Sequence, residues 1–277
     1  MYAANFGSDN VVVYSINQTT GALTQLDAVP AGDGPRELSL DPSGGFLYAV
    51  NQNDDTISAW LLDTADGRLT ELAGSPYATG DEPFGKAFTL DGRNLYVTPR
   101  IDNAIQRFSR DPATGELTAA ETTPTGELPK GLEISPDGRF LYAVNRGSNT
   151  VSIFSINTET GLLTDTGLTP STGDGPWGVE ITPGGDYCYV SNFADGTISA
   201  YSVNPESGAL TELSGSPYVD GNQAKRMHID ATGSFLYAAN GSDQPVSVYR
   251  IDPQTGALTQ VASPPVATDA YDVNLAP

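Results

Sequence analysis

The sequence predicts an all-β protein, a β-propeller built from four-stranded antiparallel blades. Three observations lead to this fold class. A motif recurs every 46 to 48 residues, four short strand-like stretches lie inside each repeat, and turn-forming residues separate those stretches. The 30 glycines and 20 prolines among 277 residues suit a chain that turns often.

The recurring motif is an aromatic segment such as FLYAVN, and it places six tyrosines at nearly equal spacing. A glycine follows each tyrosine by 19 residues, in segments such as TTGALT and ETGLLT. Because this spacing is constant, length variation falls in the other half of the repeat. The tyrosines are Tyr2, Tyr48, Tyr96, Tyr142, Tyr189 and Tyr237, and the glycines are Gly21, Gly67, Gly115, Gly161, Gly208 and Gly256.

Each repeat is predicted to hold four strands, which the first complete repeat illustrates in order. The stretches ELSLD (37–41), FLYAV (46–50), TISAWLL (56–62) and RLTEL (68–72) alternate apolar and polar residues or carry β-branched and aromatic side chains. The connections PSGG, NQNDD, DTADG and 73–82 are rich in glycine, proline, asparagine and aspartate, as tight turns require.

The two ends of the chain predict how six repeats close into one single-domain ring. The last residues, DAYDVNLAP, match a first strand, and the opening residues, MYAANFGSDN, match a second strand onward. We therefore expect the C-terminal strand to pair with the three N-terminal strands, although a fragment of a larger ring is an alternative. The expected blades are 33–80, 81–126, 127–173, 174–220, 221–268, and 269–277 combined with 1–32.

Composition excludes several classes of function. With 34 acidic and 13 basic residues the net charge is −21, which argues against unaided nucleic-acid binding. The single cysteine, Cys188, excludes an internal disulfide and a multi-thiolate metal site. No leader pattern opens the chain and no apolar run approaches a membrane span, so we expect a soluble monomer. Both a cytoplasmic location and export after processing remain open.

Basic residues gather where the first strand of each predicted blade begins and the second ends. We aligned the first strands on Leu40, Leu90, Ile134, Ile181, Ile229 and Leu275. Four positions earlier stand Arg36, Lys86, Lys130, Trp177, Lys225 and Tyr271. The position after the second strand adds Arg100 and Arg146, alongside Phe6 and Phe193, and Arg226 follows Lys225.

This clustering predicts a site for the phosphate or carboxylate of a small anionic molecule, because converging cations can hold such a group. Aromatic residues in the same positions, such as Trp177, could form one wall of that site. The alternative is local charge balance with nearby loop acids. Those acids are Asp33, Asp81, Glu82, Glu127 and Asp174.

Candidate acid–base residues lie one position before the aligned aliphatic residues. They are Ser39, Thr89, Glu133, Glu180, His228 and Asn274. Two carboxylates beside the only histidine could act as general acid and base, although a lone histidine in a strand is more often structural. A divalent cation held by Glu133, Glu180, His228 and Asn274 is a weaker alternative. We expect no cofactor.

Another aromatic column recurs in the predicted third strands, and we interpret it as core between blades. Its members are Tyr14, Trp60, Phe108, Phe154, Tyr201 and Tyr249.

The repeat GPRELSLDPSGGFLYAVNQNDDTISAWLLDTADGRLTELAGSPY resembles that of the lactonase-type β-propellers, the family of bacterial 6-phosphogluconolactonase and the carboxymuconate-cyclising enzymes. It also resembles the YVTN repeats of surface-layer propellers. The resemblance covers the whole chain. It implies hydrolysis or formation of a lactone of an anionic sugar acid, without a required metal. It also implies an active site with inner-strand arginine and histidine and a second-strand glutamate.

The chain departs from that family pattern at three points. Arg36 fits a G-P-R-H pattern, but Glu37 stands where histidine is expected. Gln52 follows Asn51 where the glutamate is expected. Family members typically have seven blades, and this chain supplies six repeats.

The favoured hypothesis is a 6-phosphogluconolactonase-like hydrolase of a small anionic sugar lactone. The substrate would be bound by Arg36, Lys86, Lys130, Lys225, Arg100, Trp177 and Tyr271. Arg226 or Arg146 would stabilise the oxyanion, and His228, Glu133 or Glu180 would activate water. The alternatives are a non-catalytic YVTN-type propeller that acts as a binding or surface scaffold, and a metal-dependent lactonase.

Overall fold

The computed structural model describes residues 1–220, 223–241 and 246–262. All secondary-structure elements assigned in these ranges are β-strands. The strands form antiparallel sheets, most of them with four strands in the main path, which confirms the all-β class and the expected blade architecture. No helix in the described residues has the length and apolar character needed to cross a membrane. The chain divides into two compact units, Met1–Pro124 and Thr125–Pro277.

The first unit contains three sheets, each formed by strands that follow one another in the sequence. The first sheet is β1 (Tyr2–Asn5), β2 (Asn10–Ile16) and β3 (Leu23–Pro30). The second is β4 (Pro35–Leu40), β5 (Phe46–Asn51), β6 (Thr56–Leu62) and β7 (Leu69–Glu71), with β8 (Tyr77–Ala78) paired to β6. The third is β9 (Pro83–Phe88), β10 (Asn94–Pro99), β11 (Ala104–Arg110) and β12 (Leu117–Pro124).

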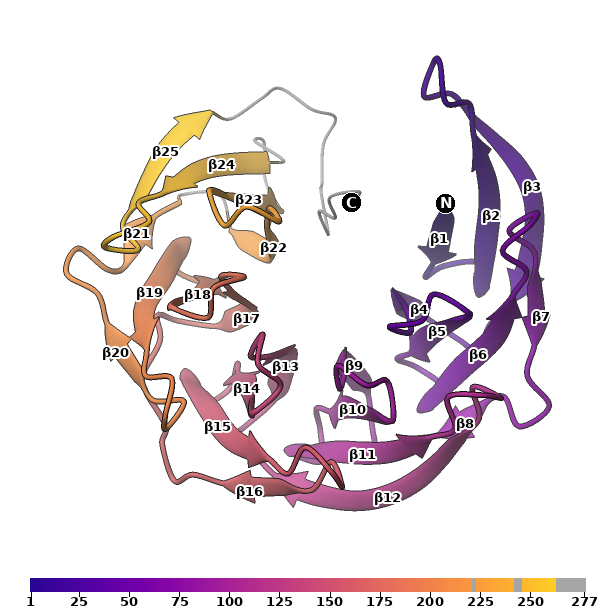
Figure 1. Cartoon of the computed structure of the whole chain (residues 1–277), viewed down its shortest axis with the longest axis horizontal. Coiled ribbons are helices and arrows are strands. Elements are labelled where there is room, and N and C mark those ends of the chain that lie inside the picture. Colours follow the sequence, from indigo (N-terminus) through magenta and orange to yellow (C-terminus); the bar gives the residue numbers. More distant parts are fainter. Residues whose placement is uncertain (221–222, 242–245, 263–277) are drawn as a thin grey trace. The chain divides into compact units, whose positions relative to one another are not determined.

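The described part of the second unit also forms three sheets, and their first strands gather on one side of the unit (Figure 1). One sheet is β13 (Pro129–Ile134), β14 (Phe140–Asn145), β15 (Thr150–Ile156) and β16 (Leu163–Asp165). The next is β17 (Pro176–Ile181), β18 (Tyr187–Asn192), β19 (Thr197–Val203) and β20 (Leu210–Glu212), with β21 (Tyr218–Val219) paired to β19. The last is β22 (Ala224–Ile229), β23 (Phe235–Asn240), β24 (Val246–Ile251) and β25 (Leu258–Ala262).

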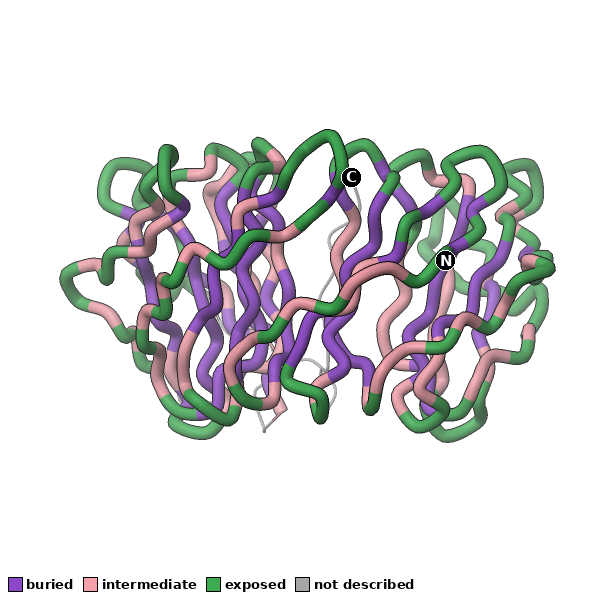
Figure 2. The backbone as a smooth tube through the Cα atoms, turned by 90° about the horizontal axis from the view of Figure 1, so that it is seen from below, coloured by how far each residue is buried: buried purple, intermediate pink, exposed green. Residues whose placement is uncertain are grey.

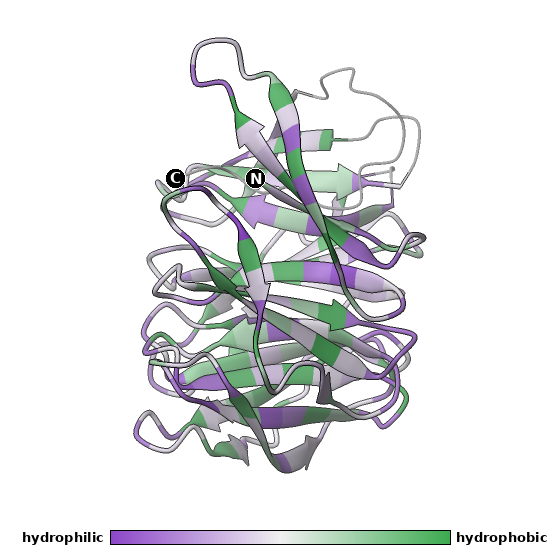
Figure 3. Ribbon diagram, turned by 90° about the vertical axis from the view of Figure 1, so that its right-hand side faces the viewer, coloured by the Kyte–Doolittle hydropathy of each residue, from purple (hydrophilic) through white to green (hydrophobic). Residues whose placement is uncertain are grey.

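Burial falls from the inner strands to the fourth strand of a sheet. The second strands β5, β10 and β14 are buried along their whole length, because they are flanked by strands on both edges and by packed side chains on both faces. The fourth strands β7, β16 and β20 are mainly exposed. Figure 2 shows buried segments along the strands and exposed turns at their ends, and Figure 3 shows hydropathy varying along individual strands.

The recurring aromatic column forms core, as the sequence predicts. Five of its members are at most 2% exposed, and four of these belong to four separate apolar clusters. Those five are Trp60, Phe108, Phe154, Tyr201 and Tyr249. Tyr14 is half-buried.

The recurring tyrosines and glycines of the repeat contact each other between neighbouring sheets. The tyrosine hydroxyl of one sheet donates a hydrogen bond to the glycine carbonyl of the next sheet. In the first unit Tyr2 bonds to Gly67 at 2.8 Å and Tyr48 to Gly115 at 2.6 Å. In the second, Tyr142 bonds to Gly208 at 3.0 Å and Tyr189 to Gly256 at 2.7 Å.

Glycine is required at these contacts for two reasons. Gly115 has a φ of +75°, which disfavours residues with a Cβ. A Cβ on Gly115 would also lie 2.3 Å from the Phe46 ring. The same close approach occurs at Gly208 against Phe140 and at Gly256 against Tyr187.

The register of β9 corrects one part of the sequence alignment. Tyr96 pairs with Ala87, whereas Tyr48 pairs with Ser39. Ala87 and not Thr89 therefore occupies the candidate acid–base position. The residue equivalent to Arg36 is then Phe84 and not Lys86.

The alignment on Leu90 was wrong because Leu90 lies in the turn after β9, where it is 61% exposed. The C-terminal strand expected at 269–277 lies outside the described residues. Closure of six blades and a single-domain organisation therefore stay predictions.

Replacing Gly115 by alanine should destabilise the protein by about 2–4 kcal/mol, which combines left-handed backbone strain with overpacking against Phe46. Gly21→Ala is the matched control, because Gly21 has a φ of +72° but a Cβ there would meet nothing within 4 Å. Its cost should be only about 1 kcal/mol. Urea unfolding measures both values, and equal losses would contradict the packing argument.

Candidate functional site

The candidate residues of the second unit lie where each first strand begins and each second strand ends, which we call the leading end of a sheet. Pro129 pairs with Asn145 there, so Lys130 and Arg146 are neighbours at the leading end of β13 and β14. The same pairing brings Trp177 next to Phe193, and it brings Lys225 next to Gly241. Each of these side chains belongs to the residue directly after one member of a cross-strand pair. The three pairs are Pro129 with Asn145, Pro176 with Asn192, and Ala224 with Asn240.

Two glycines allow the first strands to approach closely at this end. A Cβ on Gly131 would lie 2.8 Å from the carbonyl oxygen of Trp177, and one on Gly178 would lie 2.8 Å from that of Lys225. The Ser191 hydroxyl also donates to the Lys225 carbonyl at 2.8 Å. The backbones of β13, β17 and β22 are therefore held side by side, which brings their leading-end side chains together.

Cations of the second unit contact aromatic rings at this end. The Lys130 Nζ lies 3.2 Å from the Trp177 ring centroid, and the Arg146 guanidinium lies 5.5 Å from it. Trp177 packs on Phe193 with centroids 5.1 Å apart, and the Lys225 Nζ lies 6.0 Å from the Phe193 ring. The electron-rich face of an aromatic ring attracts a cation, so these contacts help to hold the basic side chains at the leading end.

The acid–base candidates of the second unit share one register. Glu133, Glu180 and His228 pair with the repeat tyrosines of their own sheets, on the neighbouring strands β13, β17 and β22. The structure therefore supports the sequence-based alignment of these three residues.

Burial changes the chemistry of Glu133 most clearly. Loss of hydration raises the pKa of the Glu133 carboxyl to about 8, so much of it is protonated at neutral pH. Burial also raises the pKa of the Cys188 thiol, with further contributions from the Glu133 and Glu180 carboxylates. Both carboxylates therefore influence one point of the core.

The described residues do not support the alternative of a metal site. Among them, no three His, Cys, Asp or Glu side chains are arranged to hold a metal ion. That search includes Glu133, Glu180 and His228. Asn274 and the predicted substrate-binding Tyr271 lie outside the described residues.

In the first unit, Arg36 stacks on aromatic rings while Lys86 pairs with a carboxylate. The Arg36 guanidinium lies 4.6 Å from the Phe6 ring centroid and 5.4 Å from that of Phe84. The Lys86 Nζ lies 3.5 Å from the Glu37 carboxylate, and their side chains are only 2% and 10% exposed. Lys86 therefore forms a buried ion pair instead of the leading-end cation expected from the sequence.

Arg100 also pairs with a carboxylate in the first unit. Its guanidinium contacts Oε2 of Glu82 through Nη2 at 2.5 Å and Nε at 2.6 Å. The Gln52 side-chain amide donates to the same oxygen at 3.2 Å. The sequence left local charge balance open as an alternative to a substrate site. For Lys86 and Arg100 the structure supports this alternative, because both residues form ion pairs with carboxylates.

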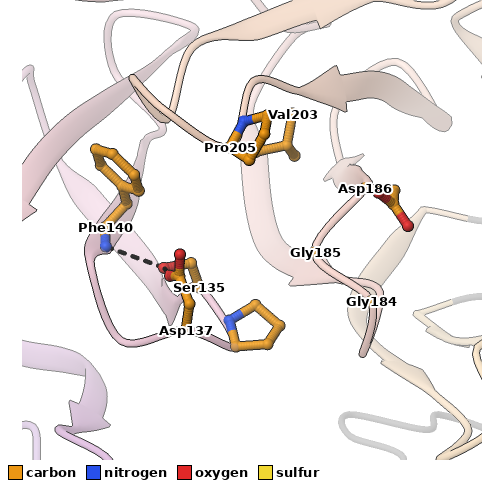
Figure 4. Close-up of a pocket in the computed structure, with 9 residues that line it drawn as sticks. Ser135, Asp137, Phe140, Gly184, Gly185, Asp186, Val203 and Pro205 are labelled. Atoms are coloured by element: carbon orange, nitrogen blue, oxygen red, sulfur yellow. Dashed lines mark hydrogen bonds between the residues drawn. The ribbon is translucent and has the colours of Figure 1, made fainter.

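A pocket of about 300 Å³ in the second unit lies at the opposite ends of the strands (Figure 4). Asp137 and Asp186 contribute to its lining. Burial would raise the pKa of Asp137, but hydrogen bonds from Ser135 and Arg139 outweigh it and leave the pKa below its ordinary value. Two carboxylates make this pocket a poor site for an anionic substrate.

Sequence reasoning missed the role of Phe84. The signal that could have found Phe84 is the proline that begins four of the first strands. It precedes Arg36, Phe84, Lys130 and Trp177. Aligning on this proline and not on a downstream aliphatic residue gives the register that the structure shows.

Comparison with known proteins gives one family and several partial relatives. A family model described as "Lactonase, 7-bladed beta-propeller" matches residues 1–83, 87–177 and 169–274. A 6-phosphogluconolactonase of Formosa agariphila is 39% identical over 75 residues, which cover 26% of this chain and 21% of that protein. One from Pectobacterium carotovorum is 30% identical over 135 residues, which cover 45% and 41%. In these matches the chain spans less than half of each relative's length.

A solved structure shows the same fold. The periplasmic gluconolactonase of Pseudomonas aeruginosa superposes with a TM-score of 0.81 at 20% identity, over 94% of this chain and 78% of that one. The family description counts seven blades, whereas the sequence repeats predict six.

Replacing Glu133 by glutamine should remove a pH dependence of stability. The pKa of Glu133 is raised from 4.5 to about 8, so the wild type loses stability relative to the variant as pH rises through this window. Unfolding temperatures at pH 5 and pH 9 measure the difference, with the exposed Glu127→Gln as control. If the unfolding temperatures of wild type and Glu133→Gln differ by the same amount at pH 5 and at pH 9, Glu133 is not desolvated.

Proposed function

Because the chain belongs to the family of seven-bladed β-propeller lactonases, we propose that it is a hydrolase that opens a small anionic sugar lactone, in the manner of a 6-phosphogluconolactonase. The partial relatives named 6-phosphogluconolactonase support this substrate class. Fold alone would be weak support for activity, so the proposal rests on the side chains of the second unit.

One observation carries the proposal. Acid–base groups occur on the three neighbouring strands β13, β17 and β22, and β13 and β22 also carry cations closer to the leading end. Lys130 and Arg146 lie over the Trp177 ring there, in the same unit as the Glu133 carboxyl, whose raised pKa keeps much of it protonated at neutral pH. An anionic lactone needs both kinds of group, one to bind it and one to transfer protons.

In the proposed binding mode, Lys130, Arg146 and Lys225 hold the phosphate or carboxylate of the substrate. Charge-assisted hydrogen bonds to such a group are about twice as strong as neutral ones. The Trp177 ring fixes Lys130 in place, so little side-chain freedom is lost when the ligand binds.

In the proposed chemical step, water attacks the lactone carbonyl carbon while His228 or Glu180 accepts a proton from that water. Arg226 or Arg146 stabilises the negative oxygen of the tetrahedral intermediate. The ring C–O bond then breaks, and protonated Glu133 gives its proton to the departing alkoxide. The product is the hydroxy acid, and the proton held by the base is returned to solvent or to Glu133.

A non-catalytic binding scaffold is the second candidate. The Lys86–Glu37 and Arg100–Glu82 ion pairs favour it, because they show that some cations of the repeat serve internal charge balance. A scaffold would give no acceleration of lactone hydrolysis over the spontaneous rate. A metal-dependent lactonase would lose its activity on treatment with a chelator.

Replacing Lys225 by alanine should raise KM for 6-phosphogluconolactone about tenfold or more and change kcat little, because a charge-assisted contact to the phosphate is lost. The KM for uncharged gluconolactone should stay the same. A pH-stat assay with and without chelator, corrected for spontaneous hydrolysis, measures both substrates and tests the two alternatives.

Arg139→Ala is the matched control, because it removes one cation from the same unit at the opposite end of the strands, where Arg139 pairs with Asp137. It should leave both KM values unchanged, and Lys225→Arg should restore most of the affinity. Equal effects of Lys225→Ala on the charged and uncharged lactones would contradict the assigned role.

A further inference from the structure

A buried arginine joins two neighbouring sheets in the first unit. The Arg110 side chain is 1% exposed, and its guanidinium donates three hydrogen bonds to separate groups. Nη2 donates to the Asp41 carboxylate at 2.9 Å, and Nε donates to the Tyr48 hydroxyl at 2.7 Å. Nη1 donates to the Gly92 carbonyl at 3.0 Å, and the guanidinium carbon lies 4.9 Å from the Phe46 ring centroid. The repeat can therefore form a complete binding site for a guanidinium group.

In the second unit, Val203 occupies the position that corresponds to Arg110. Each of these residues ends the third strand of its sheet. The Arg110 N–H donates to the Arg93 carbonyl at 2.7 Å, and the Val203 N–H donates to the Asp186 carbonyl at 2.9 Å. Both strands thus meet the same turn of their own sheets, and Asp186 stands where the first unit has Arg93.

The turn between β17 and β18 has the geometry of its counterpart in the first unit. Gly185 corresponds to Gly92, and both have a left-handed φ, of +79° and +66°. A Cβ on Gly92 would lie 3.3 Å from Cδ of Pro42, and a Cβ on Gly185 would lie 3.9 Å from Cδ of Pro136. The Gly185 carbonyl is therefore oriented like the Gly92 carbonyl, which accepts a hydrogen bond from Arg110.

The second unit keeps the aromatic ring of this site and replaces its carboxylate. The Phe46 N–H donates to the Asp41 carboxylate at 2.8 Å, and the Phe140 N–H donates to the Ser135 hydroxyl at 2.9 Å. Phe140 thus corresponds to Phe46, and Ser135 corresponds to Asp41. A cation beside Phe140 needs a carboxylate from another residue.

A pocket of about 300 Å³ lies beside Val203, between the sheets β13–β16 and β17–β20 (Figure 4). This volume is at the lower end of the range of small-molecule sites. Valine is smaller than the residues at the same position of other third strands, which are Leu62, Arg110, Ile156 and Ile251. The lining includes Ser135, Phe140, Gly185, Asp186, Val203 and Pro205.

Acidic side chains dominate the charge around this pocket. Asp137 lines it and pairs with Arg139 at 2.7 Å. The hydrogen bond and the charge of Asp137 raise the pKa of Arg139, and the charge of Glu206 raises it further. Asp186 takes part in none of the ion pairs of the described residues. The Asp186 carboxylate can therefore serve a cation from outside the chain.

We propose that the pocket binds a small cationic ligand through a guanidinium group. The Asp186 carboxylate and the Gly185 carbonyl accept its N–H groups, Phe140 provides the aromatic contact, and the alkyl chain of the ligand packs on Val203 and Pro205. A guanidinium suits this set better than an ammonium, because it is planar, weakly hydrated and carries its donors in a fixed fork. The pocket lies at the opposite ends of the strands from the leading end, so the inference does not rest on the proposed function.

Calorimetric titration with three ligands that share a butyl chain tests the site. Butylguanidinium carries the proposed group, butylurea carries a neutral group of the same shape, and butylammonium carries a charge without the planar fork. Wild type should bind butylguanidinium with a dissociation constant of about 1 mM or lower. It should bind the other two ligands about tenfold more weakly or worse. Equal affinity for butylguanidinium and butylammonium, or no binding of butylguanidinium, would overturn the inference.

A pair of charge variants tests the assigned carboxylate. Asp186→Asn should weaken butylguanidinium binding about tenfold, because a charge-assisted hydrogen bond is lost. Glu159→Gln is the matched control, since it removes one negative charge from an exposed residue of the same unit that does not line this pocket. The control should bind butylguanidinium like wild type. Equal losses in the two variants would mean that overall charge alone attracts the ligand, which contradicts the proposal.

Changes at Val203 test the pocket itself. Val203→Arg supplies the side chain that the first unit has at this position, so it should fill the pocket and abolish binding. Thermal unfolding shows whether this variant folds. Val203→Leu should also weaken binding by filling the pocket, and it should fold because leucine occupies the equivalent position at Leu62. Unchanged binding in the folded variants would locate the ligand elsewhere and overturn the inference.

The source of the guanidinium group is tested with Nα-acetylarginine amide, which represents an arginine side chain within a peptide. Weaker binding than that of butylguanidinium supports a free small molecule, which the pocket volume favours. Equal or tighter binding would overturn the assignment to a free ligand in favour of a peptide. None of these measurements depends on lactone hydrolysis, so a failure of the proposed function leaves their outcome unaffected.

Discussion

The hydrogen bond from a repeat tyrosine to the glycine carbonyl of the next sheet is the interaction on which the rest of each unit depends. In the second unit it joins Tyr142 to Gly208 and Tyr189 to Gly256. The same two tyrosines pair with Glu133 and Glu180 inside their own sheets. The bond that spaces neighbouring sheets thus also fixes the register of the proposed catalytic groups.

The predicted substrate-binding cations lie in two kinds of environment. In the first unit, Lys86 and Arg100 are paired with carboxylates, which cancels their charge locally. In the second unit, Lys130 contacts the Trp177 ring, which lowers the cost of burying an ammonium group. In a chain with a net charge of −21, basic residues gathered at one end of neighbouring strands favour an anionic ligand there.

The sequence was sufficient to predict the repeat, the strands and the buried aromatic column, because each follows from spacing and hydropathy. It was not sufficient to predict the β9 register. Leu90 is apolar, like the aliphatic residues of the other first strands, but it lies in a turn. Whether a basic residue faces a ring or a carboxylate depends on neighbouring sheets, as Arg36 and Lys86 show. The desolvation that raises the pKa of Glu133 likewise arises only from packing.

The proposed function requires an anionic sugar acid to bind at the leading end of the second unit. A crystal structure with 6-phosphogluconate, the product of the proposed reaction, would show where this molecule binds. We expect the phosphate against Lys130, Arg146 or Lys225 and the carboxylate beside Glu133 and His228. Binding in the pocket that contains Asp137 and Asp186, or no binding at all at saturating concentration, would contradict it.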